Sequence, residues 1–395
     1  MDGLSWHTLS FNPLAAFGLL LLLGAIGGQV ATRVARLPGV TGYLLAGLVI
    51  GPAGLGLVGN QALSQASLFV ELALGLALFE IGRRIDLHWL RRETALLSTS
   101  ALTSLLIFVA LYALLLSFGL KPVGAALLAA IGVATSPAVI LEIVRETRAE
   151  GQVSERLATA TGLNTLFALM AFGLALAYSG VADSAAPGDK LLSTAWLMLG
   201  SAALGLVAGM AAIRLNAWLG GGERRAQQVL LFALIALVVG VAELLETLPA
   251  MALLVFGMAS QNLRRGQTVA EPDLLSRSHI FFVAFFVASG ALLSPASLSM
   301  YWPVALLYVL VRLGISVACW LAAARFNGLS LKQGALLGLA AMPLSGGAFT
   351  LLLLASPMLE AGVATGALLA ALCILELIGP VMTRLSLRLS GETRE

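Results

Sequence analysis

Long apolar stretches separated by short polar turns run through the whole chain. Thirteen of them are long enough to cross the ~30 Å hydrocarbon core of a bilayer as helices. They are roughly 14–36, 39–58, 64–82, 93–118, 122–144, 155–179, 190–214, 226–246, 248–263, 273–294, 301–325, 331–355 and 361–385. The pattern predicts an all-α membrane protein with about thirteen transmembrane helices. No long hydrophilic stretch interrupts it, so we expect one membrane domain over residues 1–395 without a soluble regulatory domain.

Two of these segments contain helix breakers near their middle. Segment 122–144 has Thr135-Ser136-Pro137, and segment 331–355 has a Pro and two Gly within 342–347. A break inside the bilayer frees backbone groups that lipid cannot satisfy, so it is tolerated only inside protein or beside a water-filled cavity. The two segments are seven spans apart and therefore cross in opposite directions. We expect them to meet near the midplane as the broken helices of an inverted repeat, where transporters place their central site.

Composition agrees with a membrane protein. The chain is 59% hydrophobic and 11% charged, with a mean hydropathy of +0.97, whereas a soluble domain carries about 25% charged residues. Its two cysteines, Cys319 and Cys373, lie in apolar runs and provide neither a disulfide framework nor metal-ligand spacing. We therefore expect no cofactor, no metal beyond a monovalent cation, and no nucleic-acid partner.

Basic residues are distributed unevenly between the loops. Twenty of the 23 Lys and Arg residues lie in one set of alternate connections, whereas the other set holds only Lys121 and Lys190. Because cytoplasmic loops carry the excess of Lys and Arg, the N-terminus is predicted to lie outside and the C-terminus in the cytoplasm. An odd number of spans gives the same orientation. The expected location is the cell (inner) membrane.

Several stretches resemble the monovalent cation:proton antiporter superfamily. The sequence GVTGYLLAGLVIGP at 39–52 is similar to a Gly-Tyr-Leu-Leu-Ala-Gly signature of that family. Segments 248–260 and 281–295 and the ELIGP at 376–380 follow in the family order. The resemblance covers essentially the whole chain. It implies a sodium or potassium/proton exchanger with a thirteen-span inverted-repeat fold and two crossed, broken helices.

The resemblance also implies an architecture and partners. The family forms homodimers in which a mobile core carries the broken helices and moves against a dimerisation domain, as in an elevator. By this likeness, the core would comprise about 93–179 and 273–385 with 64–92, and the dimerisation helices about 14–58 and 190–263. The implied partners are a monovalent cation, the proton, the lipid bilayer and a second copy of the chain.

The chain departs from the family where the family has its acids. The helix after the first break usually carries an Asp preceded by Asn, Asp or Gln, whereas this sequence has Asn164-Thr165. The second break often carries an Arg-Gly-Glu-type cluster and here reads Leu344-Ser345-Gly346-Gly347. Amide and hydroxyl oxygens can bind a cation but cannot carry a proton near neutral pH. The candidate cation-binding residues are Thr135, Ser136, Asn164, Thr165 and Ser345.

Arg312 lies about halfway through its span, where a guanidinium is costly without a partner. It matches a position where the family often has a Lys or Arg between the crossed helices. As a counter-charge it would face either the carbonyl ends of the broken helices or a bound carboxylate. The alternative is a structural ion pair, for which Glu376 is the candidate partner.

Proton exchange needs a group that titrates, and the candidates are acids within the spans. Glu376 and Glu80 are the deeper ones, but Glu80 precedes Arg83 by three residues and is expected to form an ion pair with it. We therefore favour Glu376 as the proton carrier. Other acids and the histidines lie nearer to span ends, where solvated roles are expected: Glu71, Glu142, Glu243, Glu246, His7, His88 and His279.

The sequence thus predicts a cation:proton antiporter and leaves three alternatives open. One is a cation uniporter or channel-like relative that has lost proton coupling. Another is a non-transporting membrane sensor or scaffold, in which side chains would fill the cavity that a transporter keeps open to Asn164. An intramembrane enzyme is the least favoured, because the chain has no paired Asp, Ser/Lys dyad or His-Glu-x-x-His spacing.

Overall fold

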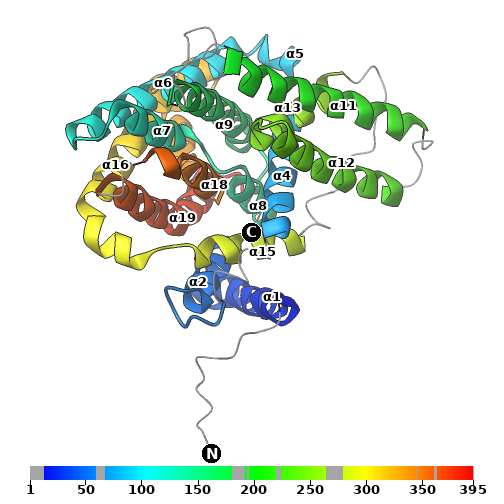
Figure 1. Ribbon diagram of the computed structural model, residues 1–395. Helices are drawn as coiled ribbons and strands as arrows, with labels where there is room; N and C mark the ends of the chain where they lie inside the picture. The colour runs from blue at the N-terminus through cyan, green and yellow to red at the C-terminus, as the bar shows by residue number, and fades with distance from the viewer. Residues whose placement is uncertain are drawn as a thin grey trace, which may run out of the picture.

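The computed structural model describes residues 13–58, 67–179, 192–193, 195–218, 224–263, 279–344, 346–359 and 363–394. Within these ranges the chain is helical and contains no strand (Figure 1). Each of the thirteen predicted apolar segments contains a helix. The predicted all-α class is therefore confirmed.

The helix bounds follow the apolar segments closely. In chain order the α-helices are α1 (Pro13–Val30), α2 (Gly39–Ile50), α4 (Ser67–Arg83), α5 (Leu87–Leu90), α6 (Thr94–Ser117), α7 (Pro122–Val133), α8 (Pro137–Glu146), α9 (Gln152–Ser179), α11 (Ser201–Trp218), α12 (Arg224–Leu244), α13 (Pro249–Asn262), α15 (His279–Ala291), α16 (Pro295–Ala322), α17 (Leu331–Ala340), α18 (Gly346–Ala355) and α19 (Val363–Leu389). Among the described residues, eight helical stretches are long and apolar enough to cross a membrane. Helices α2 and α15 are shorter and also apolar. The number of about thirteen crossings remains a prediction.

The helices pack in two groups. Helices α6, α7, α9, α16, α17 and α19 pack on one another, as seen on the left and at the top of Figure 1. Helices α4, α11, α12 and α13 form a second set, and α1, α2 and α15 continue it at the bottom of the view. Helix α8 lies at the centre and contacts α2, α4, α9 and α19. The broken helix α7–α8 is therefore surrounded by both groups.

The first break occurs because Pro137 cannot continue the helix that ends at Val133. Proline lacks an N–H, and its ring clashes with the carbonyl four residues earlier. Helix α8 begins at Pro137, the first-turn position in which proline is tolerated. The Ser136 hydroxyl caps this helix by accepting a hydrogen bond from the Val139 N–H at 3.2 Å. Residues 134–136 are not helical, and Thr135 and Ser136 are buried in the interior of the protein.

The second break has the same cause, at Pro343. Helix α17 ends at Ala340 and α18 begins at Gly346, and residues 342–344 are not helical. Gly379 of α19 lies directly against this break: a Cβ on Gly379 would lie 2.8 Å from the Pro343 Cα. A glycine is therefore required for α19 to approach the break this closely.

The last described residues connect α19 to the start of α9. The Glu392 carboxylate accepts hydrogen bonds from the Val153 and Ser154 N–H groups, both at 2.7 Å. These are first-turn N–H groups of α9, which have no carbonyl partner within the helix. The Glu392 carbonyl also accepts a bond from the Glu150 N–H at 3.0 Å. This contact fixes the α8–α9 turn against the end of α19.

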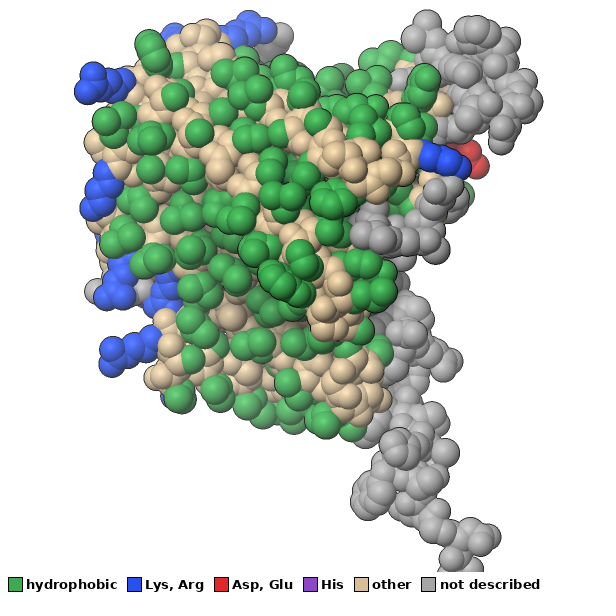
Figure 2. Space-filling model, turned by 90° about the vertical axis from the view of Figure 1, so that its left-hand side faces the viewer, with side chains coloured by type: hydrophobic (Ala, Val, Ile, Leu, Met, Phe, Trp, Pro, Cys, Tyr) green, Lys and Arg blue, Asp and Glu red, His purple; other side chains and the backbone are tan. Residues whose placement is uncertain are grey.

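The outer surface is that of a membrane protein. Figure 2 shows the face formed by the left-hand helices of Figure 1, where hydrophobic side chains cover most of the area and Lys and Arg side chains gather along one edge. Most residues of the outer spans α1 and α11 face outward, whereas the broken span 122–146 is almost entirely buried. The chain is therefore a multi-pass membrane protein with its two breaks in the interior.

Candidate functional site

The two breaks contact each other. The Ser136 N–H donates a hydrogen bond to the Pro343 carbonyl at 2.9 Å, and the Thr135 hydroxyl lies 3.5 Å from the Ala341 carbonyl oxygen. The expectation that segments 122–144 and 331–355 meet at their non-helical residues is therefore confirmed for the residues that the structure describes. Ser345, one of the candidate ligands, lies outside the described residues.

Arg312 of α16 binds the carbonyl ends of both broken helices. Its guanidinium donates to the carbonyls of Gly132 and Ala134 at the end of α7, both at 2.7 Å. It also donates to Met342 at 2.7 Å and to Ala341 at 3.3 Å, after the end of α17. The side chain is 2% exposed. One buried positive charge thus meets two helix C-termini, where the carbonyls carry partial negative charge.

Two other polar side chains on the same face of α16 extend this contact. Tyr308 and Ser316 lie four residues before and after Arg312, which places them one turn away on a helix. The Tyr308 hydroxyl donates to the Leu128 carbonyl at 3.0 Å, and the Ser316 hydroxyl donates to the Gly338 carbonyl at 2.9 Å. The α16 face is therefore a row of donors along the C-terminal halves of α7 and α17.

The hydrogen bonds of Arg312 go to the carbonyl ends of the broken helices, as the counter-charge interpretation requires, and its role as a counter-charge stays a prediction. The proposed ion pair with Glu376 is wrong, because every hydrogen bond of the guanidinium goes to a backbone carbonyl. Sequence reasoning could not identify these acceptors, since backbone carbonyls leave no mark in the sequence. The spacing of Tyr308, Arg312 and Ser316 in an apolar segment was the available signal.

The predicted polar ligands gather at the first break. The Thr165 hydroxyl lies 3.1 Å from the Thr135 carbonyl oxygen and 2.7 Å from that of Thr161. The Asn164 amide nitrogen donates to the Thr135 hydroxyl at 3.3 Å, and the Ser104 hydroxyl of α6 donates to the Asn164 amide oxygen at 3.3 Å. Ser104 is a further site residue that the sequence reasoning missed. These groups are all buried.

A small cavity opens beside these groups. Its volume is about 60 Å³, and its polar lining comes chiefly from Thr135, Ser136 and Thr165. Most of the remaining lining is apolar and includes Leu74 and Leu351 from α4 and α18. Asn164 is not among the described residues that line the cavity, but it contacts the lining residue Thr135 through a hydrogen bond. The cavity has room for one or two water-sized particles.

The site combines oxygen ligands with helix N-termini but contains no lining carboxylate. The N-terminus of α8 carries partial positive charge at this cavity. No acidic residue of the described chain lines it. Its oxygen atoms suit a small monovalent cation, whereas its hydroxyl and amide groups cannot exchange a proton near neutral pH.

Comparison with known proteins identifies the family. The profile of the transmembrane sodium/hydrogen exchanger family matches residues 18–386 of the 395. This chain belongs to that family. The resemblance inferred from the 39–52 signature is thereby confirmed, and the family is one of exchangers rather than of enzymes.

Curated relatives of the family match over part of the chain. The Na(+)/H(+) antiporter NhaS5 of Synechocystis sp. is 37% identical over 92 residues, which is 23% of this chain and 13% of that protein. The iron transporter MagA of Paramagnetospirillum magneticum is 31% identical over 169 residues, which is 42% of this chain and 36% of that protein. The matches thus span little more than a third of these relatives at most.

Solved structures of a family member share the fold over nearly the full length. The sodium proton antiporter MjNhaP1 of Methanocaldococcus jannaschii at pH 8 matches with a TM-score of 0.69 at 20% identity, over 96% of this chain and 95% of that one. An electron-microscopy structure of the same antiporter gives a TM-score of 0.75 at 18% identity, over 97% and 98%. The antiporter fold is therefore shown.

In this exchanger-family chain, the two deep acids have different surroundings. Glu376 of α19 is 2% exposed, and neither carboxylate oxygen has a hydrogen-bond partner among the described residues. Glu80 of α4 forms the expected ion pair with Arg83, at 3.1 Å. It also lines a polar pocket of about 450 Å³ with Asp86 and Glu155.

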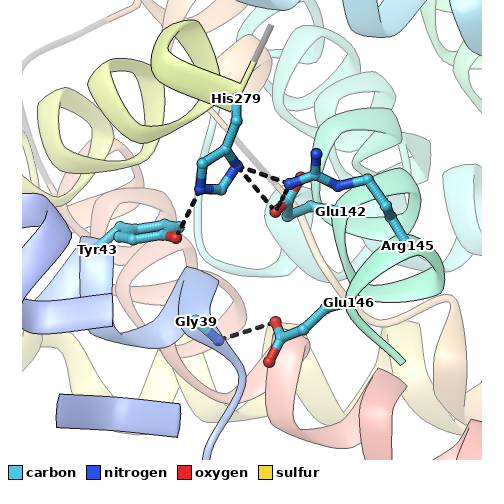
Figure 3. Close-up of polar contacts among 6 residues, drawn as sticks. All are labelled: Gly39, Tyr43, Glu142, Arg145, Glu146 and His279. Atoms are coloured by element: carbon cyan, nitrogen blue, oxygen red, sulfur yellow. Dashed lines mark hydrogen bonds and ion pairs between the residues drawn. The ribbon is translucent and has the colours of Figure 1, made fainter. Parts of the chain in front are cut away.

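A second polar cluster in this exchanger-family chain was not anticipated. Glu142 was expected to be solvated, but it is 5% exposed and its carboxylate lies 2.7 Å from Arg145. His279 lies against both residues and also contacts Tyr43 of α2 (Figure 3). The cluster could not be recognised from the sequence, because its members come from three helices that are separated by about a hundred residues or more.

Proposed function

We propose that this chain is a secondary transporter that exchanges Na⁺ or K⁺ for protons by elevator-type alternating access. The observation that carries the proposal is the meeting of two broken helices whose carbonyl ends share Arg312, in a chain of the exchanger family. A break at membrane depth is tolerated only inside protein or beside a water-filled cavity, and such breaks are where transporters build their ion sites. We place the protein in the cell inner membrane as a homodimer, with the N-terminus outside and the C-terminus in the cytoplasm.

The cation site would be formed by oxygens at the first break. The Thr135 carbonyl and the Thr165 hydroxyl lie 3.1 Å apart and face the cavity together with Ser136. The Thr165 hydrogen can be donated to Thr161, which leaves both facing oxygens available to a cation. Asn164 would act by orienting Thr135, to which its amide donates a hydrogen bond.

The part of the protein that moves would contain the crossing of the two broken helices. The mutual packing of α6, α7, α9, α16, α17 and α19 supports a core that moves as one unit. Helix α15 packs against α1 and α2, and α4 packs against α13. Helix α4 also contacts α8 and α9. We therefore place α4 and α15 at the boundary between the moving core and the remaining helices. The polar pocket at Glu80 lies along this boundary, between α4 and α9, and would be the entry for ions from the side of the basic loops.

Glu376 is the favoured proton carrier. Its buried carboxylate has no hydrogen-bond partner among the described residues, so no ion pair holds it in one charge state. Glu80 is less suitable because Arg83 already neutralises it at 3.1 Å. Arg312 donates its hydrogen bonds to backbone carbonyls and none to Glu376, which supports a carboxyl group that is free to change its charge. A carboxyl group that gains and loses its proton as the core moves would couple the two fluxes.

A second function is favoured by one observation. The cavity beside Thr165 is small, is lined mostly by apolar side chains and has no acidic residue of the described chain in its lining. This arrangement would suit a proton-uncoupled cation uniporter or a non-transporting sensor or scaffold. The two proposals differ in one measurable property, which is the dependence of cation movement on a pH gradient.

The test uses the full-length protein in sealed vesicles with a fluorescent pH indicator inside. Addition of Na⁺ or K⁺ outside acid-loaded vesicles should raise the internal pH if exchange occurs. Cation uptake without any effect of a pH gradient would identify a uniporter. No cation movement at all would leave the sensor or scaffold, and the antiporter proposal would be rejected.

Two substitutions then test the named residues. Asn164→Leu should abolish cation-dependent flux while the protein remains folded, because the amide that orients Thr135 is lost. Glu376→Gln should leave a cation flux that no longer depends on pH. Glu71→Gln is the matched control, since it makes the same chemical change in a partly exposed acid of α4 and should alter neither property. Unchanged pH profiles in Glu376→Gln would reject it as the carrier.

A further inference from the structure

A groove runs along the outer surface between the ends of α6 and α16, two helices that lie side by side (Figure 1). One wall is a face of the first turns of α6, from Thr94 to Leu102. The other wall is a face of the last turns of α16, from Ala318 onward, with Phe326 beyond it. No charged side chain of the described chain lines the groove. Its volume of about 810 Å³ is that of a site for a small molecule.

The groove exists because the residues along its walls are small. Ala95 and Ser98 line it on α6, and Ala318 and Ala322 line it on α16. At its edge stands Phe326, whose side chain is 81% exposed. An empty recess of this size would forfeit the dispersion contacts of its walls. A hydrocarbon chain is therefore the occupant that the walls fit.

A buried amide fixes the end of the groove. Asn327 closes the short 3₁₀ turn Arg325–Asn327 and is 1% exposed. Its amide nitrogen donates to the Thr99 hydroxyl at 3.0 Å and to the Ala323 carbonyl at 2.9 Å. Thr99 and Ala323 line opposite walls, so one side chain holds the two walls together. The same bonds keep the turn that carries Arg325 against α6.

Positive side chains stand at this end of the groove. Residues 91–102 and 318–327 contain three arginines, Arg91, Arg92 and Arg325, against one acid, Glu93. All three arginines are exposed. They belong to the loops with the excess of Lys and Arg, and such side chains gather along one edge of the face in Figure 2. The N-terminus of α6 adds partial positive charge, since the Glu93 side chain does not cap it.

The groove and its arginines together have the length and polarity of a phospholipid. At ~1.5 Å per residue, the wall from Thr94 to Leu102 descends ~12 Å from the membrane surface. A head group at that surface would meet the arginines, and an acyl chain would follow the wall into the hydrocarbon. Basic pockets between membrane helices bind anionic head groups in this way. A soluble anion would use the arginines but not the apolar groove below them.

We propose that this groove binds one anionic phospholipid, with its head group at Arg91, Arg92 and Arg325 and an acyl chain between α6 and α16. The lipid would join the end of α6 to a part of α16 that begins less than two turns beyond Arg312. The site lies on the helix group that contains the crossing, and not on the second group with α1 and α11. It goes beyond the exchange proposed above, because the lipid would bind whether or not a cation is transported.

The first experiment uses Cys319, a partly buried free thiol in the groove, as the reporter. The full-length protein in a non-ionic detergent is alkylated with N-ethylmaleimide in the presence of dioleoyl phosphatidylglycerol, dioleoyl phosphatidylcholine or inorganic phosphate. Phosphatidylglycerol should slow the alkylation of Cys319 severalfold. Phosphatidylcholine, which has the same chains, should need about tenfold more lipid or more, and phosphate should have no effect. The buried Cys373 should stay unreactive throughout.

The second experiment separates the head-group contact from the chain contact. Its readout is the rise in melting temperature on addition of lipid, because a ligand stabilises the state that binds it. Arg92→Gln with Arg325→Gln should weaken phosphatidylglycerol binding about fivefold for each arginine and leave phosphatidylcholine unaffected. Ala322→Phe fills the groove at an exposed position and should remove the effect of both lipids.

Matched controls place the same changes outside the groove. Arg33→Gln removes an exposed arginine near the end of α1, and Ala113→Phe enlarges an exposed alanine in the other half of α6. Both should keep the parent's response to each lipid. A loss of response in either control equal to that in its groove counterpart would reject the site.

The remaining outcomes assign the groove to another occupant or to none, and each would reject the proposal. Equal protection of Cys319 by the two lipids would mean that any hydrocarbon chain fills the groove. Protection by phosphate alone would indicate a soluble anion. Protection that grows with protein concentration in the absence of lipid would indicate a second copy of the chain. Absence of protection by either lipid would leave the groove without a bound lipid. Neither experiment uses transport, so a protein that moves no cation would reject the exchange and leave the lipid site untouched.

Discussion

The two kinds of helix end at the crossing are treated differently. The carbonyl ends of α7 and α17 receive hydrogen bonds from Arg312, Tyr308 and Ser316. The N-terminus of α8 receives only the Ser136 cap and faces a cavity without an acidic side chain among the described residues. Partial negative charge is thus met by a full positive charge, whereas partial positive charge is met only by neutral oxygens.

This difference separates two tasks that the crossing performs. The contacts at the carbonyl ends hold the breaks together and are needed for any function of this fold. The groups at the N-terminal side include the candidate cation ligands Thr135, Ser136 and Thr165, and no acidic residue of the described chain lines the cavity beside them. Changes at the carbonyl ends should affect folding. Changes on the N-terminal side should affect only the affinity for the cation and its coupling to protons.

The largest effect is expected from Arg312→Met. This substitution leaves four carbonyls without the Arg312 donor, three of them in fully buried bonds, and each unsatisfied buried group costs about 1–3 kcal/mol. The melting temperature in detergent should fall by about 10 °C or more, or the protein should fail to accumulate. The measurement is the thermal unfolding curve of the purified protein.

Two further variants make the Arg312 result specific. Arg312→Lys keeps the charge but cannot reach four carbonyls with one ammonium group, so it should be intermediate in stability. Arg325→Met removes an exposed arginine shortly after the end of α16 and should change the melting temperature little. A fully stable Arg312→Met protein would mean that the carbonyl ends need no counter-charge.

A smaller effect is expected from Thr165→Asp, which places a carboxylate beside the first break. The new carboxylate would lie near the Thr135 carbonyl, from which the Thr165 hydroxyl is now 3.1 Å away. Two oxygens with negative charge repel unless a cation lies between them, so the variant should bind Na⁺ or K⁺ about tenfold more tightly. The measurement is the rise of melting temperature with cation concentration, because a ligand stabilises the state that binds it.

Thr165→Asn is the control for added bulk without added charge. It should show the parent's cation dependence. If Thr165→Asp behaves in the same way as Thr165→Asn, the cavity beside Thr165 is not the cation site. The sensor or scaffold interpretation would then be favoured.

The smallest effect is expected from Ser136→Ala. Loss of a helix cap costs about 1 kcal/mol, which corresponds to a shift of a few degrees in melting temperature. Ser330→Ala is the matched variant, since Ser330 caps α17 in the same way through Gln333. Both should lose similar stability, but only Ser136→Ala should also reduce cation flux, because Ser136 lines the cavity. If Ser136→Ala and Ser330→Ala show equal cation fluxes, Ser136 acts only as a helix cap.

The breaks and the helical segments could be predicted from the sequence because their causes are local. Pro137 and Pro343 cannot continue a helix wherever they stand, and apolar length alone indicates a span. The polar residues near Pro137 were likewise identified from their position near the middle of an apolar segment. Such arguments need only the residue and its neighbours.

The contacts of Arg312 and Glu142 could not be predicted because they depend on distant segments. Arg312 binds a backbone carbonyl 180 residues earlier. Every residue has such a carbonyl, so the residue type does not identify the acceptor. Glu142 looked solvated because it lies near the end of its segment, yet packing of α2 and α15 against α8 covers it. Position along a helix gives depth in the membrane but not the neighbour at that depth.

The Arg312 contact also constrains how the protein is made. The first break is synthesised long before α16, since Gly132 and Ala134 precede their guanidinium partner by 180 and 178 residues. Until α16 enters the membrane, water or the insertion machinery has to satisfy these carbonyls. The first broken helix therefore reaches its final form only late in assembly, and a chain stopped before residue 312 would hold an incomplete crossing that quality-control proteases can recognise.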